Sequence, residues 1–150
     1  MLLIPLIISS FAIAGEYEKV WHWQSTSSPN IVVCNDAKTS IDTVRAAVDF
    51  WETEGYSFGS VTKNNNICQK DWHSSTIIIH GDKNLDTSKY NGTTQPWFSP
   101  STGKLKSAVV MFDSDHANVQ ELVNHELGHA LGLAHTNDPN DVMFGGKKNY

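Results

Sequence analysis

The eleven residues from His125 to His135 constrain the fold of this chain more than any other segment. His125 and His129 stand four positions apart, so on an α-helix they project from one face, one turn from each other. Gly132 permits a sharp exit from that helix, because glycine adopts positive φ without a Cβ clash. His135 then returns from an irregular segment as a third nitrogen ligand. Three protein ligands leave one tetrahedral position of a zinc ion open for water, an arrangement typical of catalytic zinc.

Glu126 lies between the two helical histidines and indicates what that water does. On the helix it stands beside the metal without binding it, where it can accept a proton from a zinc-bound water of pKa about 7. A bare H-E-x-x-H also occurs as ordinary helix-surface residues, but the added glycine and third histidine argue against coincidence. The sequence therefore predicts one catalytic zinc ion held by His125, His129 and His135, with Glu126 as general base.

Hydrophobic periodicity predicts the elements around this motif. A helix is expected over 40–54 with Ser40 as N-cap, and a second from near Asn118 to Gly132, with Asn118 and Glu121 as a capping box. Apolar and β-branched runs predict strands at 30–33, 76–79 and 107–112, with a further candidate at 56–62. Residues 81–103 are rich in Asn, Thr, Ser, Gly and Pro, which predicts a long surface loop with at most a short edge strand.

Residues 1–14 have the features of a secretion signal. They carry no charge, contain an apolar run from Leu2 to Ile8, and end in Ala12-Ile13-Ala14, the small-x-small pattern of a signal-peptidase site. A buried first strand is the alternative, and the segment is too short to span a bilayer as a helix. We therefore expect a signal peptide over 1–14, a catalytic domain over 15–150, and an extracellular protein.

The two cysteines, Cys34 and Cys68, are consistent with export. An even cysteine count behind an export signal favours one disulfide in an oxidising compartment. Two buried free thiols are the alternative interpretation. Neither cysteine is near the histidine motif in the sequence, so sulfur is not expected to ligate the catalytic zinc.

The net charge of −5 and a pI near 5.7 exclude some partner classes. No basic cluster exceeds the pair Lys147–Lys148, so the chain lacks the basic surface that nucleic-acid binding requires. We expect a protein or peptide substrate, no membrane partner in the mature form, and a monomer.

The extended motif H-E-x-x-H-x-x-G-x-x-H resembles that of the metzincin zinc peptidases. Met143 follows His135 by eight residues and looks like the Met-turn of that superfamily, whose methionine forms an apolar floor beneath the metal. The stretch 135–144 is most similar to the matrixins, with Thr136 where they usually have serine. This resemblance implies an α+β fold, in which a mixed, mostly parallel twisted sheet carries a backing helix and an active-site helix. It also implies a secreted zinc metalloendopeptidase whose extended substrate pairs with an edge strand near 92–98.

Two other functions stay open from the sequence. One is a non-catalytic zinc-binding domain on a degenerate peptidase scaffold, against which the intact Glu126 argues. The other keeps the enzyme but gives it cell-wall peptides or other peptide conjugates as substrates.

Two further ion sites of the matrixins match only in part. His80-Gly81-Asp82 resembles the start of their structural-zinc loop, but Gln95 and Met111 stand where the remaining histidines would be, so a second zinc is not expected. Asp113 begins a stretch similar to a matrixin calcium segment, with His116 in place of its glutamate. Asp113 is therefore a weak candidate calcium ligand, and Ca²⁺ an optional second cofactor.

Overall fold

The computed structural model describes residues 17–25, 28–70, 72–82, 85–146 and 150. The signal peptide expected over 1–14 lies outside the described residues and stays a prediction. Within the described residues, five strands and two helices follow one another in the order β1 (Asn30–Val33), α1 (Ile41–Thr53), β2 (Val61–Lys63), β3 (Thr76–His80), β4 (Gly92–Phe98), β5 (Leu105–Phe112) and α2 (Gln120–Ala130).

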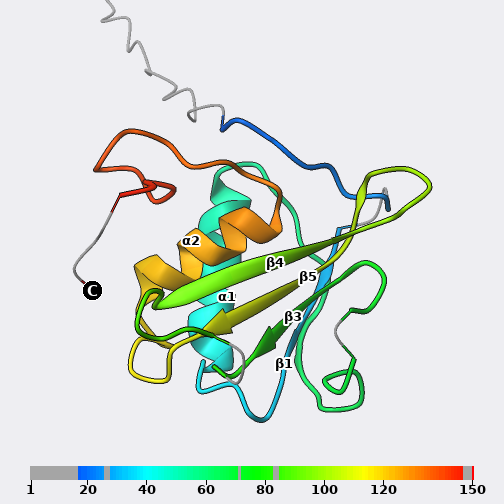
Figure 1. Ribbon diagram of the computed structural model, residues 1–150, viewed down its shortest axis with the longest axis horizontal. Coiled ribbons are helices and arrows are strands. Elements are labelled where there is room, and N and C mark those ends of the chain that lie inside the picture. The colour runs from blue at the N-terminus through cyan, green and yellow to red at the C-terminus, as the bar shows by residue number, and fades with distance from the viewer. Residues whose placement is uncertain (1–16, 26–27, 71, 83–84, 147–149) are drawn as a thin grey trace, which may run out of the picture.

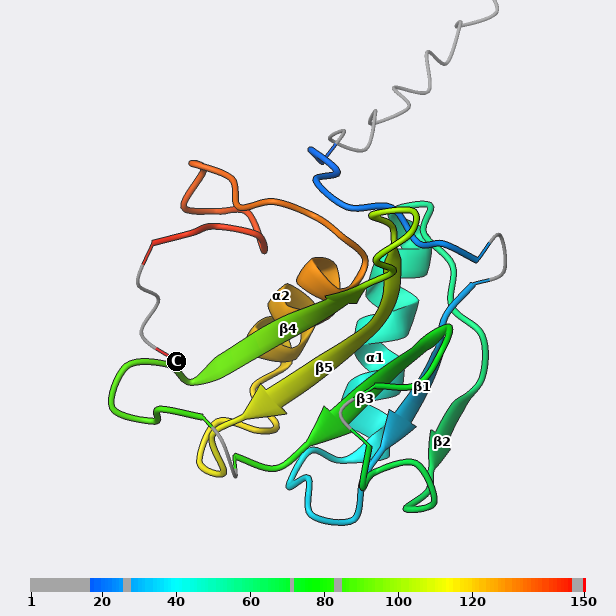
Figure 2. The ribbon, with the colours of Figure 1, turned by 45° about the vertical axis from the view of Figure 1, so that its right-hand side comes forward.

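The strands form one sheet in the order β2-β1-β3-β5-β4. This order puts β4 at one edge of the sheet. Neighbouring strands are parallel except β4 and β5, which are antiparallel. Both helices cover the same face of this twisted sheet (Figure 1 and Figure 2). The arrangement confirms the predicted α+β, metzincin-like fold, with α1 as the backing helix and α2 as the helix that carries His125 and His129.

The main core lies between the sheet and the two helices. Alternate residues of the strands, such as Ile31 and Ile77, point into it and meet the apolar faces of α1 and α2. Trp51 of α1 is fully buried, and its Nε1–H donates to the carbonyl of Asn124 on α2 at 2.8 Å. Because a buried indole N–H needs an acceptor, this bond fixes α2 against α1.

The opposite face of the sheet carries a smaller apolar cluster. Ile78, Val109 and Met111 pack there with Cys34, which forms the expected disulfide with Cys68. The Cα atoms of the two cysteines are 5.8 Å apart, within the range that a disulfide spans without backbone distortion. The loop after β2 is thereby held against the ends of β1 and β3.

The start of α2 differs from the sequence prediction. Its N-cap is Val119, which makes no side-chain capping bond, so the capping box of Asn118 and Glu121 was wrong. Asn118 instead accepts a hydrogen bond from the Ser40 backbone N–H at 2.7 Å and donates to the Lys38 carbonyl at 2.9 Å. The Asn118 side chain thus bonds to the backbone at the start of α1 and not to its own helix. Ser40 caps α1 as predicted.

β4 and β2 differ most in extent from the prediction. β4 has seven residues within the segment expected to be mainly loop, because it pairs with β5 along almost its whole length. Pro96 is tolerated there, since an edge strand can leave one N–H position unpaired. β2 covers only Val61–Lys63 and not the longer stretch expected from residue 56.

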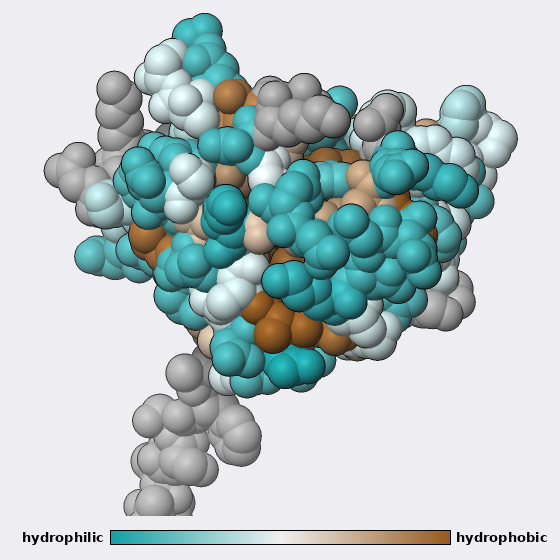
Figure 3. Space-filling view, turned by 90° about the horizontal axis from the view of Figure 1, so that it is seen from below, coloured by the Kyte–Doolittle hydropathy of each residue, from teal (hydrophilic) through white to brown (hydrophobic). Residues whose placement is uncertain are grey.

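The surface seen from below is mainly hydrophilic, with hydrophobic residues only in small areas (Figure 3). Among the described helices, none has the length and apolar character that crossing a membrane requires.

Candidate zinc and catalytic site

The three histidines of the motif converge on one point. The Nε2 atoms of His125 and His129 are 3.1 Å apart, those of His129 and His135 are 3.0 Å apart, and those of His125 and His135 are 3.3 Å apart. A tetrahedral zinc ion with bonds of about 2.0–2.1 Å holds neighbouring ligand atoms about 3.3 Å from each other. The nitrogen triangle therefore has nearly the size of one face of a zinc tetrahedron, and these residues fit the ion.

Backbone carbonyls determine which ring nitrogen faces the centre. Nδ1 of His125 lies 2.7 Å from the Val142 carbonyl oxygen, and Nδ1 of His129 lies 2.9 Å from that of Leu133. Because a carbonyl only accepts, each Nδ1 donates a proton and each Nε2 presents its lone pair to the centre. Burial lowers the pKa of His129 to about 4, so this ring stays neutral and able to ligate a metal in mild acid.

The chain leaves α2 at Gly132, whose φ is +96°. A Cβ at this position would also collide with the carbonyl oxygen of Trp21. The backbone N–H groups of Val20 and Trp21 donate to the Gly132 carbonyl at 2.9 and 3.2 Å, and that of Ala134 donates to the Glu18 carbonyl at 3.0 Å. The N-terminal segment (residues 17–24) therefore runs beside the helix exit and fixes the backbone that leads to His135.

Met143 is fully buried and packs against the motif helix. A Cβ on Gly128 would collide with the Met143 Sδ atom and lie 2.6 Å from the Trp51 ring, so only glycine fits at position 128. The Thr136 N–H donates to the Met143 carbonyl at 2.8 Å. This bond joins the turn at Met143 to the segment that carries His135.

Asp141 holds the turn that orients His125. Its Oδ1 atom accepts from the Met143 N–H at 2.6 Å, and its side chain also accepts from the Tyr17 hydroxyl. Burial, followed by the charge of Asp141, raises the pKa of Tyr17 to about 12, so the hydroxyl keeps the proton that it donates. A hydrogen-bonded path thus joins the N-terminal segment to the turn containing Val142, whose carbonyl orients His125.

Glu126 is buried beside the histidines and is held by β4. The Thr94 Oγ1 atom lies 2.7 Å from Glu126 Oε2 and 2.9 Å from the Glu126 carbonyl oxygen. Burial raises the pKa of Glu126 to about 7, and the hydrogen bond from Thr94 opposes this shift. A carboxyl group that titrates near neutral pH can both accept a proton and return it. A cation held by the histidines would favour the carboxylate and lower this pKa.

The histidines and Glu126 line a cavity of about 650 Å³, within the usual size of ligand-binding clefts. Residues 92–94 of β4 form one wall, and Leu122 of α2 also contributes. Trp21 reaches the cavity from the N-terminal segment, and Phe144 and Tyr150 reach it from beyond the Met143 turn.

The residues that resemble the matrixin structural-zinc loop do not assemble into that site. Met111 lies opposite His80 in the sheet and is buried in the outer cluster, whereas Gln95 lies opposite Val109. His80 contacts Asp36 instead, with 3.6 Å between Nδ1 and Oδ2.

The Asp113 carboxylate forms hydrogen bonds within its own loop. Its Oδ1 accepts from the Asp115 N–H at 2.9 Å, and its Oδ2 lies 2.9 Å from the His116 Nδ1 atom. These two contacts lower the pKa of the Asp113 carboxyl group. Calcium binding at Asp113 stays a prediction, and an ion there would compete with both contacts.

Four residues of the site were missed by reasoning from the sequence: Tyr17, Thr94, Gly128 and Asp141. Only Gly128 carries a usable signal, since a glycine inside a helix requires a reason and here the reason is close packing. Thr94 and Tyr17 act through contacts with segments far away in the sequence, and Asp141 combines such a contact, with Tyr17, with a local bond from the Met143 N–H.

The chain was also compared with known proteins. A family model described as Matrixin matches residues 18–148, which include the histidine motif and most of the N-terminal segment. A comparison with curated proteins gives no significant match.

Proposed function

Because this chain belongs to the matrixin family of peptidases, we propose that it is a secreted zinc-dependent metalloendopeptidase. The observation that carries the proposal is the triangle of Nε2 atoms from His125, His129 and His135, with the buried Glu126 on the same cavity. A structural zinc site has no use for a carboxylic acid beside its ligands. A hydrolytic site needs one, since water must lose a proton to attack a peptide carbonyl.

The three histidines would hold the ion through their Nε2 atoms. When bound, zinc supplies Lewis-acid chemistry, because it polarises a carbonyl and makes a neighbouring water more acidic. The carbonyls of Val142 and Leu133 keep two of the rings in the ligating tautomer before any ion arrives. The site is therefore prepared for metal by the fold.

Glu126 would act as the general base and then as the general acid. Its carboxylate accepts a proton from the attacking water and returns that proton to the amine that leaves. Thr94 supports both steps, because its hydroxyl holds Oε2 in place. This arrangement fixes the carboxylate and leaves its other oxygen available to the reaction.

An extended peptide is the substrate that the cleft supports best. β4 is an edge strand, and its residues 92–94 line the cavity beside Glu126. A peptide that adds to this edge as a further strand would run along the histidines with its backbone hydrogen-bonded to β4. We propose unfolded or flexible segments of proteins as the natural substrate class.

Secretion and a monomeric state are part of the proposal. The composition of residues 1–14 supports an export signal, and the disulfide between Cys34 and Cys68 is compatible with an oxidising compartment. N-terminal sequencing of protein secreted by an expression host tests the first, with Gly15 as the expected first residue. Sedimentation at equilibrium tests the second.

Two substitutions separate catalysis from zinc binding. Glu126→Gln keeps the shape of the side chain and should retain zinc, yet peptide hydrolysis should fall by about 10²–10⁴-fold, the usual contribution of a general base. His129→Ala should lose zinc and activity together. The measurements are zinc content per chain and hydrolysis of a denatured-protein library, with cross-linked cell-wall peptides as a second substrate panel.

Two results would contradict the proposal. One is a Glu126→Gln variant with wild-type activity. The other is a wild type that binds zinc tightly and hydrolyses neither panel, which would support a non-catalytic zinc-binding domain instead. If only the cell-wall peptides are hydrolysed, the protein is still a zinc hydrolase, but its substrate class differs from the one proposed.

A further inference from the structure

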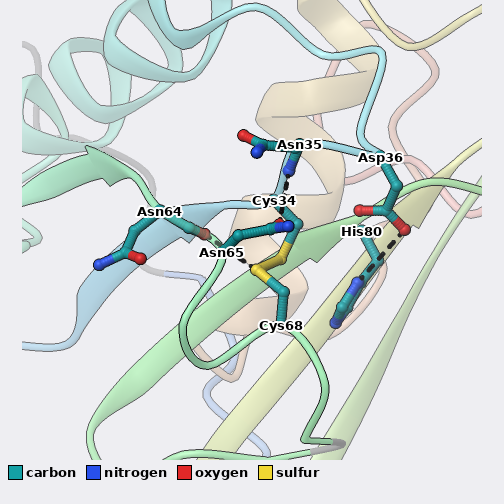
Figure 4. A network of polar contacts seen from close by, with 7 residues as sticks. All are labelled: Cys34, Asn35, Asp36, Asn64, Asn65, Cys68 and His80. Carbon is teal, nitrogen blue, oxygen red and sulfur yellow. Dashed lines mark hydrogen bonds and ion pairs between the residues drawn. A yellow bond between two sulfur atoms is a disulfide. The ribbon is translucent and has the colours of Figure 1, made fainter.

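A second group of metal-ligating side chains lies on the far side of the sheet from α2. Ligand atoms of Cys34, Asp36 and His80 all lie within 4.8 Å of one another, and Cys68 joins the group through its disulfide with Cys34 (Figure 4). The four residues come from three segments: the end of β1, the end of β3, and the loop that follows β2. None of them belongs to the histidine site.

We propose that Cys34, Cys68, His80 and Asp36 form a second zinc site that exists only when the disulfide is reduced. The proposal does not depend on the proposed peptidase function. In the oxidised protein the two sulfur atoms are bonded to each other and carry no charge. Only His80 and Asp36 are then left as donors, and two ligands hold zinc poorly.

Reduction converts this pair of donors into a complete tetrahedral set. A dithiol or phosphine reductant breaks the sulfur–sulfur bond, is itself oxidised, and leaves two cysteine thiols. Zinc binding then displaces one proton from each thiol, because the ligand is the thiolate. Two thiolates, one neutral imidazole and one carboxylate make a closed site of the structural kind.

The distances on the imidazole and carboxylate side already suit the ion. His80 Nδ1 and Asp36 Oδ2 are 3.6 Å apart, close to the separation of about 3.3 Å between nitrogen and oxygen ligands of one zinc ion. Once their bond is broken, the two sulfur atoms must move apart to about 3.8 Å to occupy two tetrahedral positions of one zinc ion. The Cα atoms, 5.8 Å apart, permit this by side-chain rotation.

The loop that carries Cys68 is held in place by contacts other than the disulfide. The Asn35 N–H donates to Asn65 Oδ1 at 3.1 Å (Figure 4). The Asn64 N–H donates to the Val33 carbonyl at 3.2 Å. Ile67 of the same loop packs on the outer cluster. After reduction these contacts keep Cys68 near Cys34, so the ligands are gathered before the ion binds.

The site is accessible enough for an ion to enter and buried enough to hold it. The Asp36 side chain is 49% exposed and the His80 side chain 18%, whereas Cys34 is fully buried. Zinc at this position would replace the disulfide as the link between the β2–β3 loop and the ends of β1 and β3. The fold would then keep this link in a reducing environment that contains zinc.

Cobalt(II) is the probe for this site, because cobalt–thiolate bonds give an intense near-ultraviolet charge-transfer band that imidazole and carboxylate ligands do not. The full chain is titrated with cobalt, oxidised and after treatment with a phosphine reductant. We expect one equivalent and no thiolate band for the oxidised protein, and two equivalents with the band for the reduced protein. Zinc should displace the cobalt and remove the band.

Matched variants make the result specific. In the reduced protein, His80→Ala should weaken the second equivalent by at least about tenfold, the scale of losses at metal sites. His22→Ala, a change at an exposed histidine elsewhere, should leave it unchanged. The double variant Cys34→Ser/Cys68→Ser should bind one equivalent in either redox state.

A reduced protein that binds no more cobalt than the oxidised protein and shows no thiolate band overturns the proposal. So does a thiolate band of equal affinity in wild type and His80→Ala, which is the result expected if the reduced chain unfolds and its free thiols bind cobalt without a site. Circular dichroism of the same samples identifies that case.

Discussion

The motif region (residues 125–143) and the N-terminal segment (residues 17–24) build one site in different ways. The motif region supplies every group to which we assign a chemical role, and the spacing of the motif predicts these groups. The N-terminal segment supplies none, yet it pairs with the exit from α2 and reaches the Met143 turn through Tyr17. Ligands are thus encoded locally, whereas their orientation depends on contacts between distant segments.

Gly132→Ala tests the junction of the two regions and should have the largest effect on stability. The change forces a positive φ on alanine, which costs about 1–2 kcal/mol, and drives a Cβ into the Trp21 carbonyl, which adds about 1–3 kcal/mol. Gly55→Ala is the control, since Gly55 also has positive φ but nothing lies within 4 Å of its Cβ position. Urea unfolding of both variants measures the difference. Equal losses would show that the N-terminal segment does not constrain the exit.

The pH dependence of stability tests how deeply the motif region buries Glu126. In the metal-free protein the pKa of Glu126 is about 7, against 4.5 for a free side chain. The folded state therefore binds the proton of the Glu126 carboxyl group more tightly than the unfolded state does. The stability that this difference contributes is complete below pH 4.5 and is lost as the pH rises through 7. The loss amounts to about 3 kcal/mol at most.

Glu126→Gln removes this titration while preserving the side-chain shape, and serves as the reference. Unfolding in the presence of chelator should show wild type losing stability relative to the variant between pH 4.5 and pH 7. The titrating histidines are common to both proteins and cancel in the difference. Parallel stability curves would mean that Glu126 is solvated in the folded protein.

Tyr17→Phe tests whether the N-terminal segment acts on the motif region at a distance. It removes the hydroxyl that binds Asp141 and keeps the ring against Trp51, so we expect a loss of about 1–2 kcal/mol in stability. Zinc affinity, measured by chelator competition, should fall by up to about tenfold, because the turn that orients His125 loosens. Tyr56→Phe, at the other tyrosine that packs on Trp51, is the control and should keep wild-type zinc affinity. If Tyr17→Phe has the zinc affinity of wild type, the N-terminal segment stabilises the fold without affecting metal binding.

The parts of the molecule that local patterns govern were predictable from the sequence. Hydrophobic periodicity predicted both helices, and runs of apolar and β-branched residues predicted β1, β3 and most of β5. The spacing of the three histidines predicted that their side chains converge on one point. Asn118 shows where such reasoning stops. Asn118 has a preference for N-cap positions, but its side-chain oxygen instead accepts a hydrogen bond from the backbone N–H of Ser40, the N-cap residue of α1, 78 residues earlier.

β4 and Thr94 were harder to predict for a related reason. The residues of β4 are polar and include a proline, so their strand structure depends on pairing with β5 and not on their own preference. The register of that pairing puts the Thr94 hydroxyl on Glu126. No pattern in the sequence encodes this register.

The bridge between Lys19 and Leu133 also sets an order of events during synthesis. The chain leaves the ribosome from its N-terminus, so the N-terminal segment waits for its partner until the residues up to Leu133 have been made. The turn that orients His125 is made later still. Contacts of such long range form late in folding. For the proposed peptidase, cleavage activity would therefore arise only after the turn at Met143 has been synthesised and has met the N-terminal segment, so the site would be inactive while the strands and helices that precede it are being made.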